Sequence, residues 1–331
     1  MGIGTRFVFA LLAAAMSCAS TPAHTEPWPV RPVRIILPLP PGLGTDLAAR
    51  LFSEKLAVRW GQPVVVENRP GADGIVGVTS FVNGHDDHTL LFSFAGPISI
   101  NPLIHDKLPY DPVRDLVPIA TAIDNFFTIA VLRSTGVRSL HSFIEAARAD
   151  PAKFNWAATP GLPQFIFLAL QKRAGLALTQ VPYRDFAPAL QDFSENRVQV
   201  LVTSPTTLLP SVESGKALLL MVTNRHRSPI ASEVPTAAEA GFPELTFDGV
   251  VGFFGGRDLP TALRDRIAGD VAAVAEIPEL TLKLQAVGIA VRAGTPAQFS
   301  AAIEEQSAKV REIVSTEKGP ADGSPRAPET R

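Results

Sequence analysis

Cysteine is nearly absent from this chain, and strong charge of either sign is absent as well. Cys18 is the only cysteine among 331 residues, and 30 Lys and Arg stand against 32 Asp and Glu, for a net charge of −2. The basic residues are not clustered, which argues against nucleic acid as a partner. With 46% hydrophobic and 19% charged residues, the composition is typical of a globular α/β protein. Its length allows two domains of ordinary size.

Long apolar runs are also lacking, apart from one at the N-terminus. Arg6 precedes the run Phe7–Met16, and small residues follow it. This pattern predicts a secretory signal peptide over residues 1–23, because the run is too short to span a membrane. An alternative is a lipoprotein acylated on Cys18, although Ala15 stands where such signals prefer leucine. Cleavage after Ala19 or Ala23 leaves an exported, periplasmic protein with no thiol chemistry.

Familiar catalytic and metal-binding motifs are missing too. The chain contains neither a GxSxG elbow nor an HExxH helix, and no base is evident for Ser93, Thr159 or Ser204 as nucleophiles. His85 and His88 are three residues apart, but GHDDHT precedes a predicted strand and is expected to be a solvated turn. The sequence therefore predicts no catalytic residue, no metal site and no cofactor, and it disfavours an enzyme.

The stretch that organises the rest is a strand, a loop and a helix start. Val33–Leu37 is an apolar, β-branched run, Pro38–Pro41 end it, and Gly42–Gly44 form a loop before a helix that begins at Thr45–Asp46. Such a turn points backbone amides at one spot and favours an anion. Nucleotide motifs fit poorly, since no lysine follows until Lys55 and no third glycine is present. A plain turn whose glycines serve only packing is the alternative.

The chain repeats this strand–turn–helix unit. Strands are expected at 63–68, 89–93, 117–122, 127–132, 154–158, 179–182, 198–203 and 218–223, and helices at 139–149, 165–174, 187–195, 236–240, 260–275, 279–287 and 296–314. Repeated βα units predict an α/β fold with two mostly parallel sheets flanked by helices. The loop that starts at Phe94 is expected to emerge beside the first glycine loop, and Ala158–Gly161 form a second strand–loop–helix turn.

Several segments, in the same order, resemble those of the tripartite tricarboxylate transporter substrate-binding receptors, also called Bug proteins. They are WPVRPVRIILPLPPGLGTDLAARL, GQPVVVENRPGADG, INPLIHDKLPYDPVRDLVPI, VPYRDFAPALQD and VPTAAEAGFPEL. The resemblance runs from Trp28 to about Val314. It implies a periplasmic two-lobed Venus flytrap of the type II binding-protein class. Such receptors capture a small organic carboxylate between the lobes and deliver it to a membrane permease.

The resemblance also implies where the ligand binds. The first loop matches PPGGGTD with Leu43 in place of the middle glycine; Phe165 or Ile166 stands near a usual histidine, Thr203 replaces a common aspartate, and Val250 replaces a tryptophan. The missing aspartate argues weakly against an amino-acid ligand. The predicted ligand-binding residues come from loops and strand ends of both lobes: Gly42, Leu43, Gly44, Thr45, Asp46, Ser93, Ala95, Ala158, Thr159, Pro160, Gly161, Thr203 and Ser204.

The expected organisation is two lobes with crossovers between them. Lobe one is expected over 28–121 plus 224–314, lobe two over 122–223, and a disordered tail over 315–331. The expected partners are a small carboxylate and the membrane subunits of a tripartite permease, with the receptor itself a monomer. A ligand sensor for a membrane signalling system and a secreted α/β enzyme acting on a carboxylate are the competing interpretations.

Overall fold

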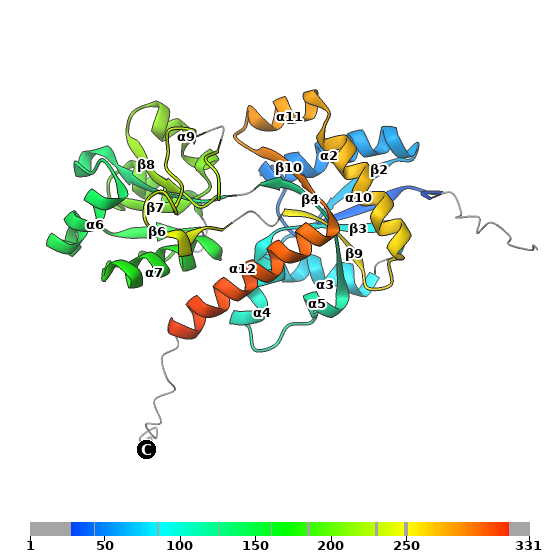
Figure 1. The fold of residues 1–331 in the computed structure, drawn as a ribbon, viewed down its shortest axis with the longest axis horizontal. Helices are drawn as coiled ribbons and strands as arrows, with labels where there is room; N and C mark the ends of the chain where they lie inside the picture. The colour runs from blue at the N-terminus through cyan, green and yellow to red at the C-terminus, as the bar shows by residue number, and fades with distance from the viewer. Residues whose placement is uncertain are drawn as a thin grey trace, which may run out of the picture.

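The computed structural model describes residues 28–42, 44–84, 86–124, 126–159, 161–183, 186–228, 231–247 and 251–317. Figure 1 shows two lobes, each built around a β-sheet, with helix α12 running from one toward the other. The predicted signal peptide and residues 318–331 of the predicted tail lie outside the described residues. Of the helices that the structure describes, none combines the length and the apolar character needed to cross a bilayer.

Lobe one contains a six-stranded sheet in the order β10-β4-β9-β3-β1-β2. Its strands are β1 (Val33–Leu37), β2 (Val64–Asn68), β3 (Thr89–Ser93), β4 (Leu116–Asp124), β9 (Val251–Gly256) and β10 (Ala290–Gly294). Its helices are α2 (Gly44–Trp60), α3 (Ile75–Gly84), α4 (Asn101–Ile104), α5 (Pro112–Asp115), α10 (Thr261–Ala275), α11 (Pro278–Gln285) and α12 (Pro296–Glu317).

Apolar cores lie on both faces of this sheet because alternate residues of a strand point to opposite sides. Ile35 belongs to the core under α2 and α10, whereas its neighbour Ile36 belongs to the core under α3 and α12. All of β1 except Arg34 is therefore buried. Burial on two faces explains why this strand is a continuous apolar run in the sequence.

Lobe two contains a four-stranded sheet in the order β6-β7-β5-β8. Its strands are β5 (Thr128–Leu132), β6 (Trp156–Ala158), β7 (Val200–Thr203) and β8 (Ala217–Val222). Its helices are α6 (Leu140–Ala149), α7 (Leu162–Ala174), α8 (Phe186–Ser194) and α9 (Pro205–Glu213). The two-lobed fold class is as predicted from the sequence.

Both sheets are mixed, however, and not mostly parallel as expected. In lobe one, β2 and β3 pair in parallel with β1, while β9 pairs antiparallel with both β3 and β4. In lobe two only β6 and β7 are parallel. The reason is that β4 carries the chain out of lobe one and β9 brings it back, so the two neighbouring strands run in opposite directions.

Two crossovers and helix α12 join the lobes. The crossovers follow β4 and precede β9, which are adjacent in the sheet. Phe299 near the start of α12 packs in lobe one, while Val310 near its end packs in the main core of lobe two. The lobe boundaries stay a prediction. Ala237 and Phe247 pack in the core of lobe two, which favours a boundary between the lobes near β9 and not at Asn224 as predicted.

The remaining differences from the predicted elements concern short segments. Residues 179–182 form only an isolated bridge at Gln180, and 236–240 form turns in place of a helix. Strands β9 and β10 and helices α4, α5 and α9 were not predicted. Helix α12 extends through Glu317, into the segment expected to be a tail, because the first helix-breaking residues come only at Gly319 and Pro320.

Candidate functional site

A cleft of about 280 Å³ lies between the lobes and is lined by residues of both. Lobe one contributes the start of α2, the segment after β3 and the end of β4. Lobe two contributes the loop before α7 and the segment that joins β7 to α9. The volume lies near the lower end of the range for small-molecule pockets, roughly 300–1,000 Å³, so a small solute fits it.

The first wall of the cleft is the start of α2. Gly44 and Thr45 line the cleft, and a Cβ on Gly44 would come within 2.7 Å of Ile289 Cδ1, so only glycine fits there without a shift. The helix start is thus present one residue earlier than predicted, at Gly44. The first four backbone amides of a helix have no partner within the helix and are available to an anion.

Asp46 braces this loop instead of lining the cleft. Its carboxylate accepts hydrogen bonds from Gly42 N at 3.0 Å, Arg50 Nε at 3.0 Å and Asn68 Nδ2 at 2.9 Å. Burial opposes the charged form, but the hydrogen bonds from Arg50, Gly42 and Asn68 outweigh it and hold the pKa of Asp46 below its usual value. The Asp46 carboxylate therefore ties Gly42 to the first turn of α2 and to β2.

The second wall is the start of α7, which begins at Leu162, three residues earlier than predicted. Thr159 and Gly161 line the cleft, and Thr159 N donates to Val202 O at 3.1 Å. Gly161 has φ of +91°, a conformation that side chains with a Cβ rarely adopt. This loop therefore depends on glycine for its backbone path and not for space.

A third helix start, that of α9, was missed from the sequence. Thr203 ends β7, Ser204 is the N-cap of α9, Pro205 begins the helix, and Thr206 and Thr207 in its first turn line the cleft. Ser204 Oγ lies 3.1 Å from Thr206 Oγ1. The available signal was a proline directly after a strand, since proline is favoured at the first position of a helix.

The predicted ligand-binding residues divide into three groups. Those that line the cleft are Gly44, Thr45, Ala95, Thr159, Gly161, Thr203 and Ser204. Those described but placed outside its lining are Gly42, Asp46, Ser93 and Ala158. Leu43 and Pro160, together with Val250 and His85, lie outside the described residues. Ser93 is fully buried, and its hydroxyl has no hydrogen-bond partner.

Aromatic and aliphatic side chains form much of the remaining lining, and sequence reasoning did not identify them. Phe94, Phe126 and Phe127 line the cleft together with Ile100 and Ile289. No local pattern marks them, because they come from the end of β3, from the crossover after β4 and from the loop before β10. The cleft is therefore polar at its helix starts and apolar between them.

Asp124 is the only charged residue among the described residues that line the cleft. Its Oδ2 accepts a hydrogen bond from Asn224 Nδ2 at 2.7 Å and lies 4.0 Å from Arg292 Nη1. Arg292 borders a separate cavity. Gln306, from α12, is 3% exposed and also lines the cleft, and its Oε1 has no hydrogen-bond partner.

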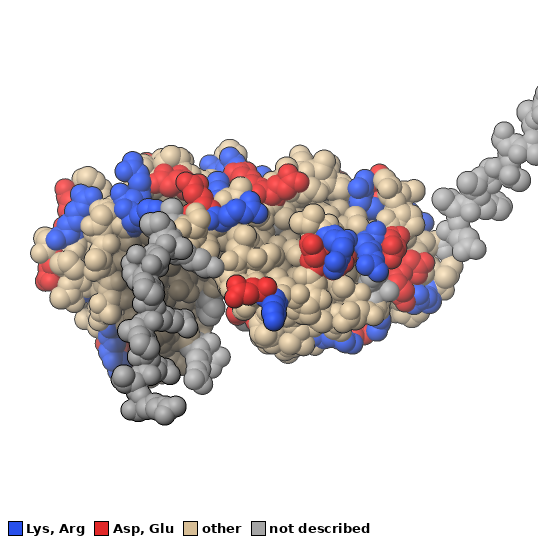
Figure 2. Space-filling model, turned by 90° about the horizontal axis from the view of Figure 1, so that it is seen from below, with Lys and Arg blue, Asp and Glu red and all other residues tan. Residues whose placement is uncertain are grey.

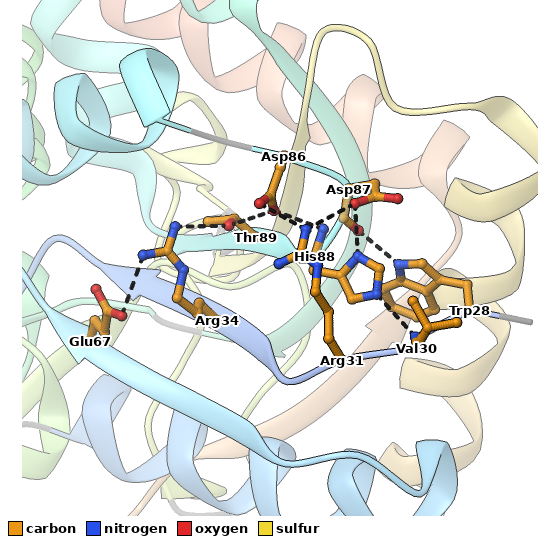
Figure 3. Close-up of polar contacts among 9 residues, drawn as sticks. All are labelled: Trp28, Val30, Arg31, Arg34, Glu67, Asp86, Asp87, His88 and Thr89. Atoms are coloured by element: carbon orange, nitrogen blue, oxygen red, sulfur yellow. Dashed lines mark hydrogen bonds and ion pairs between the residues drawn. The ribbon is translucent and has the colours of Figure 1, made fainter.

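The expected solvated turn at 85–88 is wrong for His88, which is 3% exposed. Figure 3 shows His88 between Asp87 and the chain entering β1. Its Nδ1 lies 2.7 Å from Asp87 Oδ1, and its Nε2 accepts from Val30 N at 3.1 Å. The ring also lies 5.7 Å from Trp28. The histidine was misjudged because the segment that covers it is far away in sequence.

We call Trp28, Val30, Arg31 and Asp86–Thr89 the N-terminal clasp. Arg31 Nη2 donates to Asp86 Oδ2 at 2.9 Å, and Trp28 Nε1 donates to Asp87 O at 2.8 Å. Burial alone would raise the pKa of Asp86, but hydrogen bonds from Arg31, Thr89 and His88 N outweigh it and lower that pKa. The clasp ties the entering chain to the turn before β3.

The face of the molecule seen in Figure 2 adds no second charged site. On the face shown in Figure 2, Lys and Arg lie beside Asp and Glu over both lobes and do not gather by sign. Within the described ranges, no group of three or more His, Cys, Asp or Glu side chains is placed to hold a metal ion. The interlobe cleft is thus the best candidate for a ligand.

Comparison with known proteins agrees with this arrangement. Residues 48–318 match the family model described as "Tripartite tricarboxylate transporter family receptor". A UPF0065 protein from the tcbD-tcbE intergenic region of a Pseudomonas species is 32% identical over 321 residues, which cover 94% of each chain.

Two similar solved structures contain a bound carboxylate. One is Rpa4515 of R. palustris with adipate, which is 28% identical and has a TM-score of 0.76. The match covers 87% of this chain and 98% of that one. The other is MatC (Rpa3494) of Rhodopseudomonas palustris with bound malate, which is 25% identical and has a TM-score of 0.72. The match covers 87% of this chain and all of that one.

Proposed function

Because this chain belongs to the tripartite tricarboxylate transporter receptor family, and is therefore a solute receptor and not an enzyme, we propose that it captures a small organic carboxylate between its lobes. The observation that carries this proposal is the meeting of three helix starts, those of α2, α7 and α9, in one interlobe cleft. Each start presents the positive end of a helix dipole, and first-turn amides add to it except at Pro163 and Pro205, which have no N–H, and at Gln164 and Thr207, which already donate to Gly161 O and Ser204 O.

Affinity would arise from both lobes acting together. One helix start stabilises an anion by roughly 0.3–1 kcal/mol when exposed and by up to about 2 kcal/mol when partly buried. Micromolar binding requires about −8 kcal/mol. One loop is therefore too weak, and three helix starts together contribute at most about 6 kcal/mol. Hydrogen bonds and apolar contacts formed on closure must supply the rest. Two crossovers from adjacent strands provide a hinge for such closure.

The residues proposed to contact the carboxylate are those at the helix starts. Thr45 and Thr206 line the cleft from the first turns of α2 and α9, and Thr159 lines it from the loop between β6 and α7. Leu43 and Pro160 belong to the same loops by sequence and stay in the proposal as predictions. Asp46 supports the site through the α2 loop rather than through ligand contact.

Thermal shift with a panel of organic acids, followed by calorimetry and small-angle scattering, tests the binding step. A carboxylate that binds only the closed form raises the melting temperature with the logarithm of its concentration and reduces the radius of gyration. Binding without compaction would contradict closure. Failure of every acid in the panel would contradict carboxylate capture itself.

We further propose that the receptor acts in the periplasm and delivers its ligand to a tripartite permease. Arg6, the run Phe7–Met16 and Ala19 support export. N-terminal sequencing of the protein from its host is expected to start after residue 19 or 23, and an intact Met1 or an acylated Cys18 would contradict this. Deleting the permease genes should abolish uptake of the bound acid, and uptake that persists without them would favour a sensory role.

A further inference from the structure

The side chains of the cleft indicate which class of carboxylate the receptor binds, and this inference rests on the proposed function. We propose that the receptor selects a monocarboxylate with an apolar body, such as a short aliphatic chain or a benzene ring, over a dicarboxylate of the same length. Asp124 is the residue to which the structure assigns the discrimination against a second carboxylate.

The positive potential available in the cleft suffices for one carboxylate. A helix N-terminus is equivalent to about half an elementary charge, so the starts of α2, α7 and α9 together supply about one and a half charges. No Lys, Arg or His is among the described residues that line the cleft. A second carboxylate buried there would thus lack a counter-charge, and burying an unpaired charge is strongly unfavourable.

The one charged side chain among the described residues of the cleft is negative and repels a second carboxylate. Asp124 borders both the cleft and a neighbouring cavity, whereas Arg292, which lies 4.0 Å from its Oδ2, borders only that neighbouring cavity. The guanidinium compensates Asp124 and adds no net positive charge for a ligand. Because Asp124 also accepts from Asn224, its carboxylate is already satisfied and is not a free counter-ion for a ligand ammonium.

The remaining lining favours an apolar body. Phe126, Ile100 and Ile289 are at least nine-tenths buried, and Phe94 and Phe127 are half-buried at the cleft. Closure on an apolar ligand would remove the exposed parts of Phe94 and Phe127 from water, and Phe126, Ile100 and Ile289 would offer an apolar surface behind them. Gln306 is neutral, so it can hydrogen-bond a polar substituent without balancing a second charge.

Matched ligands of equal length test the inference. Calorimetry on the purified, processed protein at pH 7 compares hexanoate with adipate, which differ only in the second carboxylate, and adds benzoate as an aromatic probe. Hexanoate or benzoate is expected to bind at least tenfold more tightly than adipate. Adipate binding as tightly as both monocarboxylates would overturn the selectivity while leaving carboxylate capture intact. Binding of none of the three at millimolar concentration would overturn both.

The Asp124→Asn variant tests the assigned residue. It keeps the shape of the side chain and an oxygen for Asn224, and it removes the charge that compensates Arg292. Adipate affinity should rise at least fivefold, while hexanoate affinity changes less than twofold. Unchanged adipate affinity in a variant that still binds hexanoate would remove Asp124 from the proposal. If that variant fails to fold, adipate binding by the Arg292→Lys variant, compared with the wild type, provides the second test. No more than a twofold change is expected, because the positive charge is kept. A larger gain would show that Arg292 and not Asp124 controls the selectivity.

Discussion

Polar side chains gather in the interlobe cleft and in the N-terminal clasp, but the two regions differ in how those side chains are satisfied. In the clasp, Asp86 accepts from Arg31, Thr89 and the His88 backbone, and both ring nitrogens of His88 lie within hydrogen-bond distance of a partner. In the cleft, Gln306 Oε1 has no partner. Helix starts also face the cleft with amides that the helices themselves do not use.

This difference indicates which polar groups stabilise the fold and which are available to a ligand. A buried polar group without a partner lowers stability, so it persists where a ligand or water completes it. A group with all its partners inside the protein stabilises the fold and has little left to offer a solute. We therefore expect substitutions in the clasp to change stability but not ligand affinity, and substitutions in the cleft to change affinity but not stability.

The largest effect is expected for His88→Ala. The change removes the acceptor of Val30 N–H and the ring beside Trp28, and it leaves a cavity at a 3% exposed position. The free energy of unfolding should fall by about 2–3 kcal/mol, measured by urea denaturation. His141→Ala is the matched control, because that side chain is 84% exposed and should change stability by less than about 0.5 kcal/mol. A His88 variant as stable as the control would remove the clasp from the stabilising structure.

Thr45→Pro should produce the largest change in affinity. Proline is tolerated in the first turn of a helix but removes the backbone amide there. Carboxylate affinity should fall at least tenfold, about 1.4 kcal/mol, by calorimetry, with a melting temperature close to that of the wild type. Thr45→Ala keeps the amide and serves as control. If the alanine variant loses as much affinity as the proline variant, the hydroxyl and not the amide holds the ligand.

Thr206→Val tests the helix start that sequence reasoning missed. It removes a hydroxyl that lines the cleft and retains the branched shape of the side chain. A roughly three- to tenfold loss of affinity is expected, the magnitude of one hydrogen bond, with no change in the urea midpoint. Thr261→Val is the control, since Thr261 is exposed in the first turn of α10 and outside the cleft. Equal effects of both variants would contradict a role for α9 in binding.

The smallest expected effect is the loss, at acidic pH, of the stability that Asp86 contributes to the clasp. The folded-state pKa of Asp86 lies below its ordinary value of 3.8, so the stability it contributes is complete above about pH 4 and is lost as the pH falls through the lowered value. Arg31 and Asp86 are 50% and 43% exposed, and such exposed pairs contribute only about 0.2–1 kcal/mol. The difference in unfolding free energy between wild type and Asp86→Asn should therefore shrink below pH 4, and a difference that grows there would contradict the assignment.

Much of the fold was determined by sequence alone, because it depends on patterns between near neighbours. The apolar run Val33–Leu37 and the glycines before α2 define the first strand, loop and helix, and the family segments predicted the two lobes. Gly44, Thr45, Thr159 and Gly161 were identified as site residues for the same reason, since strand ends, glycines and helix starts are local signals.

Only the tertiary structure decided which distant residues meet. The direction of β9 depends on where the chain returns from lobe two, and the sheets are therefore mixed. Phe127, Asp124 and Ile289 share one cleft although they come from separate segments, and His88 is buried because Trp28 and Val30 cover it from nearly 60 residues away. Burial, charge compensation and cleft lining depend on contacts between segments that the chain brings together only on folding, and local sequence patterns do not encode such contacts.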